Sequence, residues 1–245
     1  MSRHAWKIEL IPWDPSSPEH VQRMYDQRVA CGWRADEIPQ VSMPSKWVDA
    51  AKKGEKLFYW AVFSDAVPDR EALIKKHVEA YPKEAIPLKE TAAEIRLVPR
   101  QPTLAEFTPI GHVAVAIHKP EEDERLGLPP TGTVWIHGLY ISRALHGGGF
   151  GAGTMSKTEE IATQSPMNAK IVALDTLSKE AQTVPETRQI LYGNGRIPEP
   201  KVPNEDWYVR LGYEVFGRGD NIYVTLSKEG DSAPINVVYM RKLVV

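Results

Sequence analysis

The pattern of apolar and polar positions predicts alternating strands and helices from the start of the chain. Trp6 to Ile11 alternates with the two-residue period of a strand, and Leu57 to Phe63 is an aromatic-rich apolar run typical of a buried strand. Between them, apolar residues recur at helical spacing from Ser17 to Ala30, and Ser45 to Lys53 has the pattern of a second, short helix. The chain therefore begins as a mixed α/β domain.

The second half of the chain continues the alternation. Ile110 to His118 and Thr133 to Ser142 are predicted as two central strands that pair antiparallel. Gly149 to Gln164 is predicted as a helix, and Lys170 to Leu177 is apolar enough for another central strand. Tyr213 to Val245 predicts two or three strands, of which residues 236–244 are the last.

Two stretches depart from this pattern. Asp65 to Thr108 contains one predicted helix, Asp69 to Ala80, and is then punctuated by four prolines. Ser178 to Pro203 is polar and also marked by prolines. We expect the first stretch to be an insertion beside the substrate entrance, with plain surface elaboration as the alternative, because long loops of this kind are often functional.

Composition narrows the class of protein. A chain of 245 residues with 42% hydrophobic and 25% charged residues can bury a full core in one domain, or in one domain with an insertion. The net charge of −2 offers no electrostatic footprint for nucleic acid. Cys31 is the only cysteine, so no internal disulfide forms, and we expect it to be a small buried hydrophobe. No apolar run approaches the ~18 residues of a membrane span, and a cytosolic or nuclear enzyme is expected.

The segment from Leu139 to Gly153 reads LYISRALHGGGFGAG and carries the strongest chemical signal. A strand-like run and a short arm lead to glycines that stand where a helix begins. Without side chains, these glycines leave backbone N–H groups unshielded at the positive end of a helix dipole, which suits a phosphate or pyrophosphate.

Three common glycine motifs fit this segment poorly. A Walker loop requires Lys and then Ser or Thr, whereas Thr154 and Met155 follow Gly153. A dinucleotide fingerprint follows its strand directly, whereas five residues separate strand and glycines here, although Asp175 could act as its ribose-binding acid. His146 and the following glycines resemble an esterase oxyanion loop, but the chain has no Gly-x-Ser-x-Gly elbow.

A fourth pattern fits better. The run Leu139-Tyr140-Ile141, followed by His146-Gly147-Gly148-Gly149-Phe150-Gly151, resembles the acetyl-CoA signature of the GNAT N-acetyltransferase superfamily. His146 stands where that family usually has Arg or Gln. A second segment, Trp207 to Val215, resembles the family's aromatic-Tyr-x-x-x-Gly-Tyr-x-Val element in the correct order along the chain. The resemblance covers roughly Pro109 to Val244.

This resemblance implies the GNAT α/β fold: a mixed, twisted sheet of about seven strands flanked by helices, in a single domain spanning residues 1–245. Residues 65–108 would be an insertion between the second and third strands, beside the substrate entrance. The implied reaction is direct transfer of an acetyl group from acetyl-CoA to a primary amine, in a ternary complex and without a metal. The expected cofactor-binding residues are Leu139, Tyr140, Ile141, His146, Gly147, Gly148, Gly149, Phe150, Gly151 and Ser178.

The resemblance also implies catalytic residues. Tyr208 stands where the family places the tyrosine that protonates the departing thiolate, although an amphipathic core tyrosine is the structural alternative. His137 lies two residues before Leu139, so strand periodicity puts both on one face, and imidazole could accept the amine proton. Many relatives use a carboxylate on this strand, where Trp135 stands here. His112 and His118 lie on the neighbouring strand without further ligands at zinc spacing.

Acidic residues suggest a positively charged acceptor. Glu121 to Glu124 forms a predicted loop between the two central strands, and we expect it to converge with other acids on one end of the sheet. These other acids are Glu106, Asp175, Glu205 and Asp206. Tyr25 and Trp33 could line the apolar part of the same site.

Several alternatives stay open at this stage. A small-molecule acceptor is favoured because no peptide-reading module is visible, yet a protein N-acetyltransferase has the same motifs. A non-catalytic CoA-binding module and a nucleotide-dependent oxidoreductase are further alternatives. The sequence leaves open the identity of the acceptor and whether the protein is a monomer or a homodimer.

Overall fold

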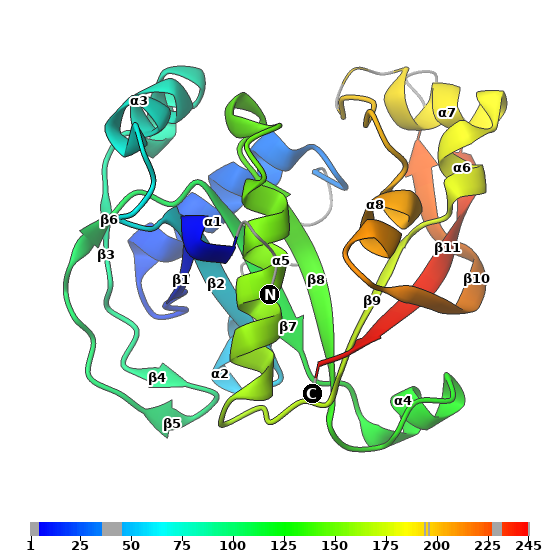
Figure 1. Cartoon of the computed structure of the whole chain (residues 1–245), viewed down its shortest axis with the longest axis horizontal. Coiled ribbons are helices and arrows are strands. Elements are labelled where there is room, and N and C mark those ends of the chain that lie inside the picture. The colour runs from blue at the N-terminus through cyan, green and yellow to red at the C-terminus, as the bar shows by residue number, and fades with distance from the viewer. Residues whose placement is uncertain (1–4, 36–45, 194, 196, 227–231, 245) are drawn as a thin grey trace.

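A computed structural model describes residues 5–35, 46–193, 195, 197–226 and 232–244. Its centre is a seven-stranded mixed sheet in the order β1-β2-β7-β8-β9-β11-β10 (Figure 1). The strands are β1 (Ile8–Pro12), β2 (Lys56–Phe63), β7 (Gly111–Ala116), β8 (Thr133–Ile141), β9 (Ile171–Leu177), β10 (Glu214–Leu226) and β11 (Ser232–Leu243). The predicted sheet of about seven strands is confirmed.

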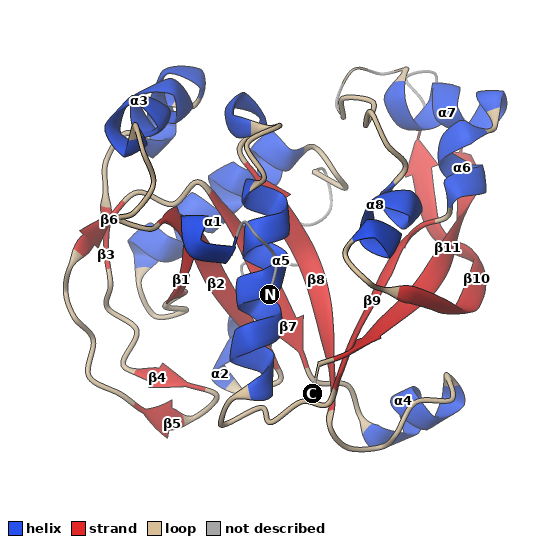
Figure 2. Cartoon of the chain, in the orientation of Figure 1, coloured by secondary structure: helices blue, strands red, loops and turns tan. Residues whose placement is uncertain are grey.

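Helices cover both faces of the sheet (Figure 2). The described helices are α1 (Pro18–Cys31), α2 (Val48–Lys52), α3 (Arg70–Ala80), α4 (Pro120–Arg125), α5 (Phe150–Thr163), α6 (Lys179–Thr183), α7 (Pro185–Tyr192) and α8 (Asn204–Arg210). On one face α5 buries Met155 against Val113, Val172 and Met240 of the sheet, and on the other Met24 of α1 packs with aromatic residues of β2. Burial of these two apolar layers forms the core.

The helix predicted from Ser17 to Ala30 forms, with Ser17 as its N-cap and a left-handed Gly32 at its C-terminus. Its buried face differs from the expected apolar stripe. Val29 is 46% exposed, whereas the inward positions include four polar residues. These are His20, Arg23, Gln27 and Arg28. The helix therefore packs through a polar network, because the elements that cover it supply polar partners.

Residues 65–108 lie between the second and third strands of the large sheet, as predicted. They contain α3 and two small sheets, formed by β3 (Leu88–Lys89) with β6 (Glu106–Phe107) and by β4 (Glu94–Ile95) with β5 (Val98–Pro99). The segment packs on α1, where Arg23 Nη2 donates to Ile86 O at 2.6 Å and Gln27 Nε2 donates to Glu84 Oε2 at 2.6 Å. It covers α1 and contributes no residue to the large cavity described below.

Other local predictions need adjustment. Residues 5–7 form a 3-10 turn, so β1 begins at Ile8, and the predicted acidic loop at 121–124 belongs to the short helix α4. The polar 178–203 stretch contains α6 and α7. The second helix is only Val48–Lys52, and Ser45, where we expected it to begin, lies outside the described residues.

The arrangement of β8 and β9 positions the site. They are parallel neighbours, but their pairing covers only Thr133–Trp135 of β8 against Ile171–Ala173 of β9. Beyond Trp135 the two ribbons diverge (Figure 2). On its other side β8 has a bulge, with a register shift against β7 and with Gly138 at φ 58°. Bulges of this kind often lie beside active sites, because they redirect side chains and leave backbone groups unpaired.

Candidate active site

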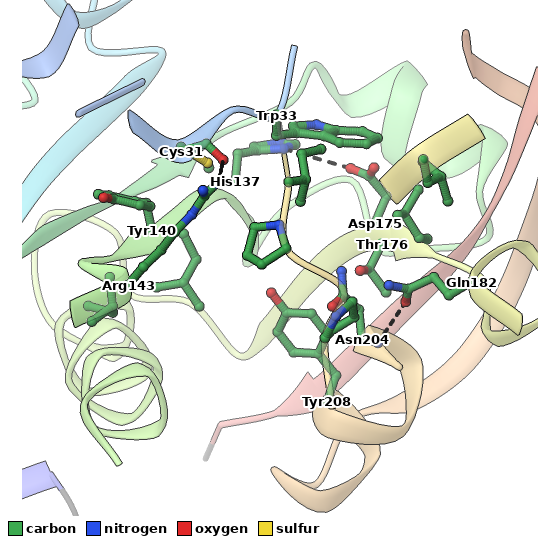
Figure 3. Close-up of a pocket in the computed structure, with 18 of the residues that line it drawn as sticks. Cys31, Trp33, His137, Tyr140, Arg143, Asp175, Thr176, Gln182, Asn204 and Tyr208 are labelled. Atoms are coloured by element: carbon green, nitrogen blue, oxygen red, sulfur yellow. Dashed lines mark hydrogen bonds and ion pairs between the residues drawn. The ribbon is translucent and has the colours of Figure 1, made fainter. Parts of the chain in front are cut away.

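A cavity of about 370 Å³ opens where β8 and β9 separate (Figure 3). Its walls come from both strands, from the end of α1 and the residues after it, and from α8. The predicted residues that line it are His137, Leu139, Tyr140, Ile141, His146, Asp175 and Tyr208. The fold therefore gathers in one cavity residues as far apart in the sequence as His137 and Tyr208.

The glycine segment forms the junction that we predicted between β8 and α5. Gly149 has φ 80° and directly precedes α5, which has no side-chain cap. The first N–H groups of α5 have no partner one turn earlier and are thus open to a ligand. Lys7 Nζ donates to Gly148 O at 2.9 Å and fixes this turn. An uncapped helix N-terminus held in this way is suited to bind an anion.

His146 and Phe150 have structural contacts within this segment. His146 Nε2 lies 3.1 Å from Ile141 O, so the imidazole links the arm to the end of β8. Phe150 is buried edge-to-face against Phe63, with ring centroids 4.9 Å apart. A second cavity beside the glycines is lined by Lys7, Lys76 and His146. The two lysines extend the favourable surface for an anion.

Tyr208 points into the large cavity from α8 (Figure 3). Its ring packs against Trp207 and Tyr213, with centroid distances of 4.8 and 5.8 Å. Its hydroxyl makes no hydrogen bond to any residue that the structure describes. Burial, and then the negative charge of Asp175, raise the pKa of Tyr208 above its ordinary value of 10.0. The phenol therefore stays protonated at neutral pH and can donate its proton to a group in the cavity.

His137 lines the same cavity from β8. Its Nδ1 lies 3.7 Å from Oδ1 of Asp175, and its ring stacks on His118. Burial, followed by the positive charge of Lys56 and by His118, lowers the pKa of His137 well below 6.5. The imidazole is thus neutral at pH 7 and able to accept a proton. The bulge at Gly138 interrupts the strand alternation from which we placed His137 and Leu139 on one face, yet both side chains reach the cavity.

Asp175 is held from the other side by Tyr223. The Tyr223 hydroxyl donates to Asp175 Oδ2 at 2.5 Å, and burial together with this carboxylate raises the pKa of Tyr223. Tyr223 also lies edge-to-face against Trp33, with ring centroids 5.7 Å apart. The predicted role of Trp33 in lining the cavity agrees with the geometry, whereas Tyr25 packs with the cluster beneath α1 instead.

Ser178 does not fit the cofactor role that we assigned to it. It is 2% exposed and caps α6 by accepting a hydrogen bond from Ala181 N at 3.1 Å, and it does not line the cavity. Nearby residues that the sequence reading did not identify line the cavity instead. Gln182 accepts from Asn204 N at 2.7 Å through Oε1, and Thr176 lies beside it (Figure 3). Gln182 belongs to the polar 178–203 stretch, which gave no periodic signal that would have identified it.

The predicted convergence of acidic residues is wrong. The helix α4 with Glu121 to Glu124 precedes β8, at the end of that strand opposite the glycines, and its Asp123 is buried as acceptor for Trp135 Nε1 at 2.7 Å. Glu205 and Asp206 both contact Lys179. Among the acids that we named, Asp175 alone lines the cavity. The order of the strands in the sheet, and not proximity in the sequence, decides which loops lie at the same end of the sheet.

No group of three or more potential ligands for a metal ion occurs in the part of the chain that the structure describes. Over the same residues, no helix is long and apolar enough to cross a membrane. His112 is buried, and its Nδ1 lies 2.8 Å from Gln27 Oε1.

Neither a family model nor a curated protein sequence matches the chain. Solved structures with the same fold include a chimera of the spermidine N-acetyltransferase SpeG from Vibrio cholerae and hSSAT (TM-score 0.53, 7% identity, 97% of this chain and 96% of that chain). Another is described as an acetyltransferase of the GNAT family from Desulfovibrio desulfuricans (TM-score 0.50, 11% identity, 97% and 99%). A third is the spermidine/spermine N-acetyltransferase SpeG from Vibrio cholerae with manganese ions (TM-score 0.50, 7% identity, 98% and 95%).

These structures belong to one class, the GNAT acetyltransferases, and cover almost the whole chain. The protein therefore has the GNAT fold, as the two sequence motifs implied.

Proposed function

We propose that this protein is an N-acetyltransferase that moves the acetyl group of acetyl-CoA to the primary amine of a small molecule. One observation carries the proposal: the protonated hydroxyl of Tyr208 points into a cavity between separated strands, and the lining of this cavity extends to His146, just before the uncapped N-terminus of α5. Acetyl-CoA has a pyrophosphate, a narrow pantetheine arm and a thioester. These three parts match, in the same order, an anion site, a channel and a proton-donating side chain.

The residues at the junction fit this donor. The backbone of residues 146–151 would hold the pyrophosphate, because glycine allows the close approach that a Cβ would obstruct. Leu139, Tyr140 and Ile141 lie where β8 has left β9, so the backbone on that side, apart from Ile141 O, which contacts His146, is available to a pantetheine arm. Lys7 and Lys76 add positive charge near the phosphates. When bound, acetyl-CoA supplies the activated acetyl group.

The cavity residues can move the protons that aminolysis requires. The amine nitrogen forms a bond to the acetyl carbon, and the carbon–sulfur bond breaks. Neutral His137 accepts the proton that the amine loses, directly or through a water, and Asp175 orients the resulting imidazolium. Tyr208 donates its proton to the departing sulfur. The products are an N-acetylated amine and the CoA thiol, and no metal or redox partner is needed.

The size of the cavity supports a small acceptor. Pockets for small molecules typically span about 300–1,000 Å³, and this cavity of about 370 Å³ lies at the lower end of that range. Trp33 and Tyr223 provide apolar walls, and Asp175 and His137 lie between them and the donor side.

The decisive test combines binding and turnover. Isothermal titration should show acetyl-CoA binding, and a library of primary amines with acetyl-CoA should release free CoA thiol for a subset of its members. Binding without turnover of any amine would identify a non-catalytic CoA-binding module. Stabilisation by NAD and not by acetyl-CoA would favour the nucleotide-dependent oxidoreductase instead.

A further inference from the structure

A buried arginine without a carboxylate partner lies on the acceptor side of the cavity. Arg28 of α1 is 2% exposed and contributes to the cavity lining. Its Nη2 donates to Trp33 O at 3.2 Å, and its Nη1 lies 3.4 Å from His112 Nε2. The Nε atom is buried without a hydrogen-bond partner. No ion pair joins Arg28 to any acid that the structure describes.

The guanidinium lies beside the reacting end of the cavity. A Cβ added to Gly138 would stand 3.8 Å from Arg28 Nη1, so the guanidinium lies against the bulge of β8. His137, the proposed base, is the adjacent residue in the chain. An acceptor whose amine reaches His137 would therefore have its neighbouring substituents close to Arg28.

The charges around Arg28 are mostly positive or neutral. Burial, followed by the charge of Arg28, lowers the pKa of half-buried Lys56 to about 8. The same two causes lower the pKa of His112 well below 6.5, so this ring is neutral. Asp175, the acid in this cavity, already accepts the Tyr223 hydroxyl. A buried cation without a counter-charge is costly, and an anion brought by a ligand would lower that cost.

We propose that Arg28 binds a carboxylate of the acceptor, so that the substrate is an amine with a carboxylate close to it, such as an amino acid. This inference rests on the proposed acetyltransferase function and reverses the cationic acceptor that the acidic residues suggested. The unpaired Nε–H and the remaining N–H groups of the guanidinium suit a carboxylate, which can accept two parallel hydrogen bonds. The edge-to-face pair of Trp33 and Tyr223 offers an apolar wall for the rest of the acceptor.

The test compares matched acceptors on the wild-type protein. Each set contains an amino acid, its amide, the decarboxylated amine and the corresponding aminophosphonate. The sets differ in the side chain of the amino acid, which is aromatic in some and aliphatic in others. For the best set we expect kcat/KM for the amino acid to exceed that for the amide and the amine by about tenfold or more, the usual scale of a charge-assisted hydrogen bond.

Variants then assign the preference to Arg28. Arg28→Met should lower kcat/KM for the amino acid by about 100-fold, and that for the amide by less than about threefold, while acetyl-CoA affinity stays unchanged. Arg28→Lys keeps the charge but not the planar fork, so an intermediate loss of about tenfold is expected. Arg23→Met is the matched control, because Arg23 is also buried on α1 but does not line the cavity.

Several outcomes would overturn the inference. One is a kcat/KM for the amides and amines equal to or higher than that for the amino acids. Another is an equal loss of kcat/KM for all acceptors in Arg28→Met. A third is a loss in Arg23→Met as large as that in Arg28→Met. A higher kcat/KM for the aminophosphonates would show that the anionic group bound by Arg28 is a phosphonate and not a carboxylate. Failure of acetyl-CoA to bind, or absence of turnover with every amine, would instead overturn the acetyltransferase function itself.

Discussion

The Nδ1 atom of His137 lies 3.7 Å from Oδ1 of Asp175, across the point at which β8 and β9 separate. The two residues come from neighbouring parallel strands that no longer pair at this level (Figure 3). A carboxylate at this distance stabilises an imidazolium that forms after proton transfer, while burial keeps the resting imidazole neutral. This relationship supports the proposed roles of His137 as the base and of Asp175 as its orienting group.

His137 should therefore control the acid side of the pH profile. Because its pKa lies well below 6.5, the neutral base is present at pH 7, and kcat should fall only as the pH drops below about 6.5. His137→Gln should lower kcat by about 100-fold and remove this acid limb. The measurement is kcat against pH at saturating acetyl-CoA and amine. An acid limb with a midpoint at or above pH 7, or one that persists in the variant, would assign the base elsewhere.

Tyr208 should behave as a proton donor and not as a packing residue. Tyr208→Phe keeps the ring that packs on Trp207 and Tyr213 and should lower kcat by about 100-fold with acetyl-CoA affinity unchanged. Because the pKa of Tyr208 is raised above 10.0, its protonation should impose no alkaline limb on wild-type kcat below pH 10. A variant with kcat within about threefold of wild type would show that sulfur protonation is not limiting.

The start of α5 should be sensitive to added side chains. A Cβ at Gly151 would meet the Trp207 ring at 3.5 Å, an ordinary contact, so Gly151→Val should fold. It should nevertheless weaken acetyl-CoA binding by about tenfold or more, because the side chain stands beside the proposed pyrophosphate site. Isothermal titration measures this effect.

Ala152→Val is the matched control for that experiment. It adds similar bulk one residue later, where the side chain borders the groove beside Glu159 and Arg210. Its acetyl-CoA affinity should stay within about threefold of wild type. Unchanged affinity in Gly151→Val, or an equal loss in both variants, would remove the glycine segment from donor binding.

The predicted sheet and glycine junction could be derived from local patterns. Leu57 to Phe63 is apolar and aromatic enough that only a buried strand accommodates it, and β2 is Lys56–Phe63. The glycines at 147–149 similarly indicate a sharp change of direction, and Gly149 indeed has a positive φ. Such features depend on residues adjacent in the chain, so the chain alone reveals them.

The polar face of α1 and the Arg28 site could not be derived in this way. Periodicity assigns apolar residues to the interior, whereas here His20, Arg23, Gln27 and Arg28 are buried. Many of their partners are distant in the chain: Gln27 contacts Glu84 and His112, which lie 57 and 85 positions away. A buried polar residue is stable only with such partners, and a single sequence does not show which distant residues meet. The bulge at Gly138 has the same origin, since it depends on the register of β8 against β7.

Glu84 should be a main source of stability for the 65–108 segment. Its carboxylate is 1% exposed, accepts from Gln27 Nε2 at 2.6 Å and faces His77 Nε2 at 3.3 Å, while His77 Nδ1 lies 2.9 Å from Ser142 Oγ. Glu84→Ala would leave these buried groups facing a void and should cost about 3 kcal/mol in the free energy of unfolding, measured by urea titration.

Glu79→Ala, at an exposed position of α3 paired with Lys75, should cost less than about 0.5 kcal/mol. Since Glu84 does not line the cavity, kcat of the folded Glu84→Ala protein should stay close to wild type. Equal stability losses for the two variants would show that α1 and the segment are held by their apolar contacts alone.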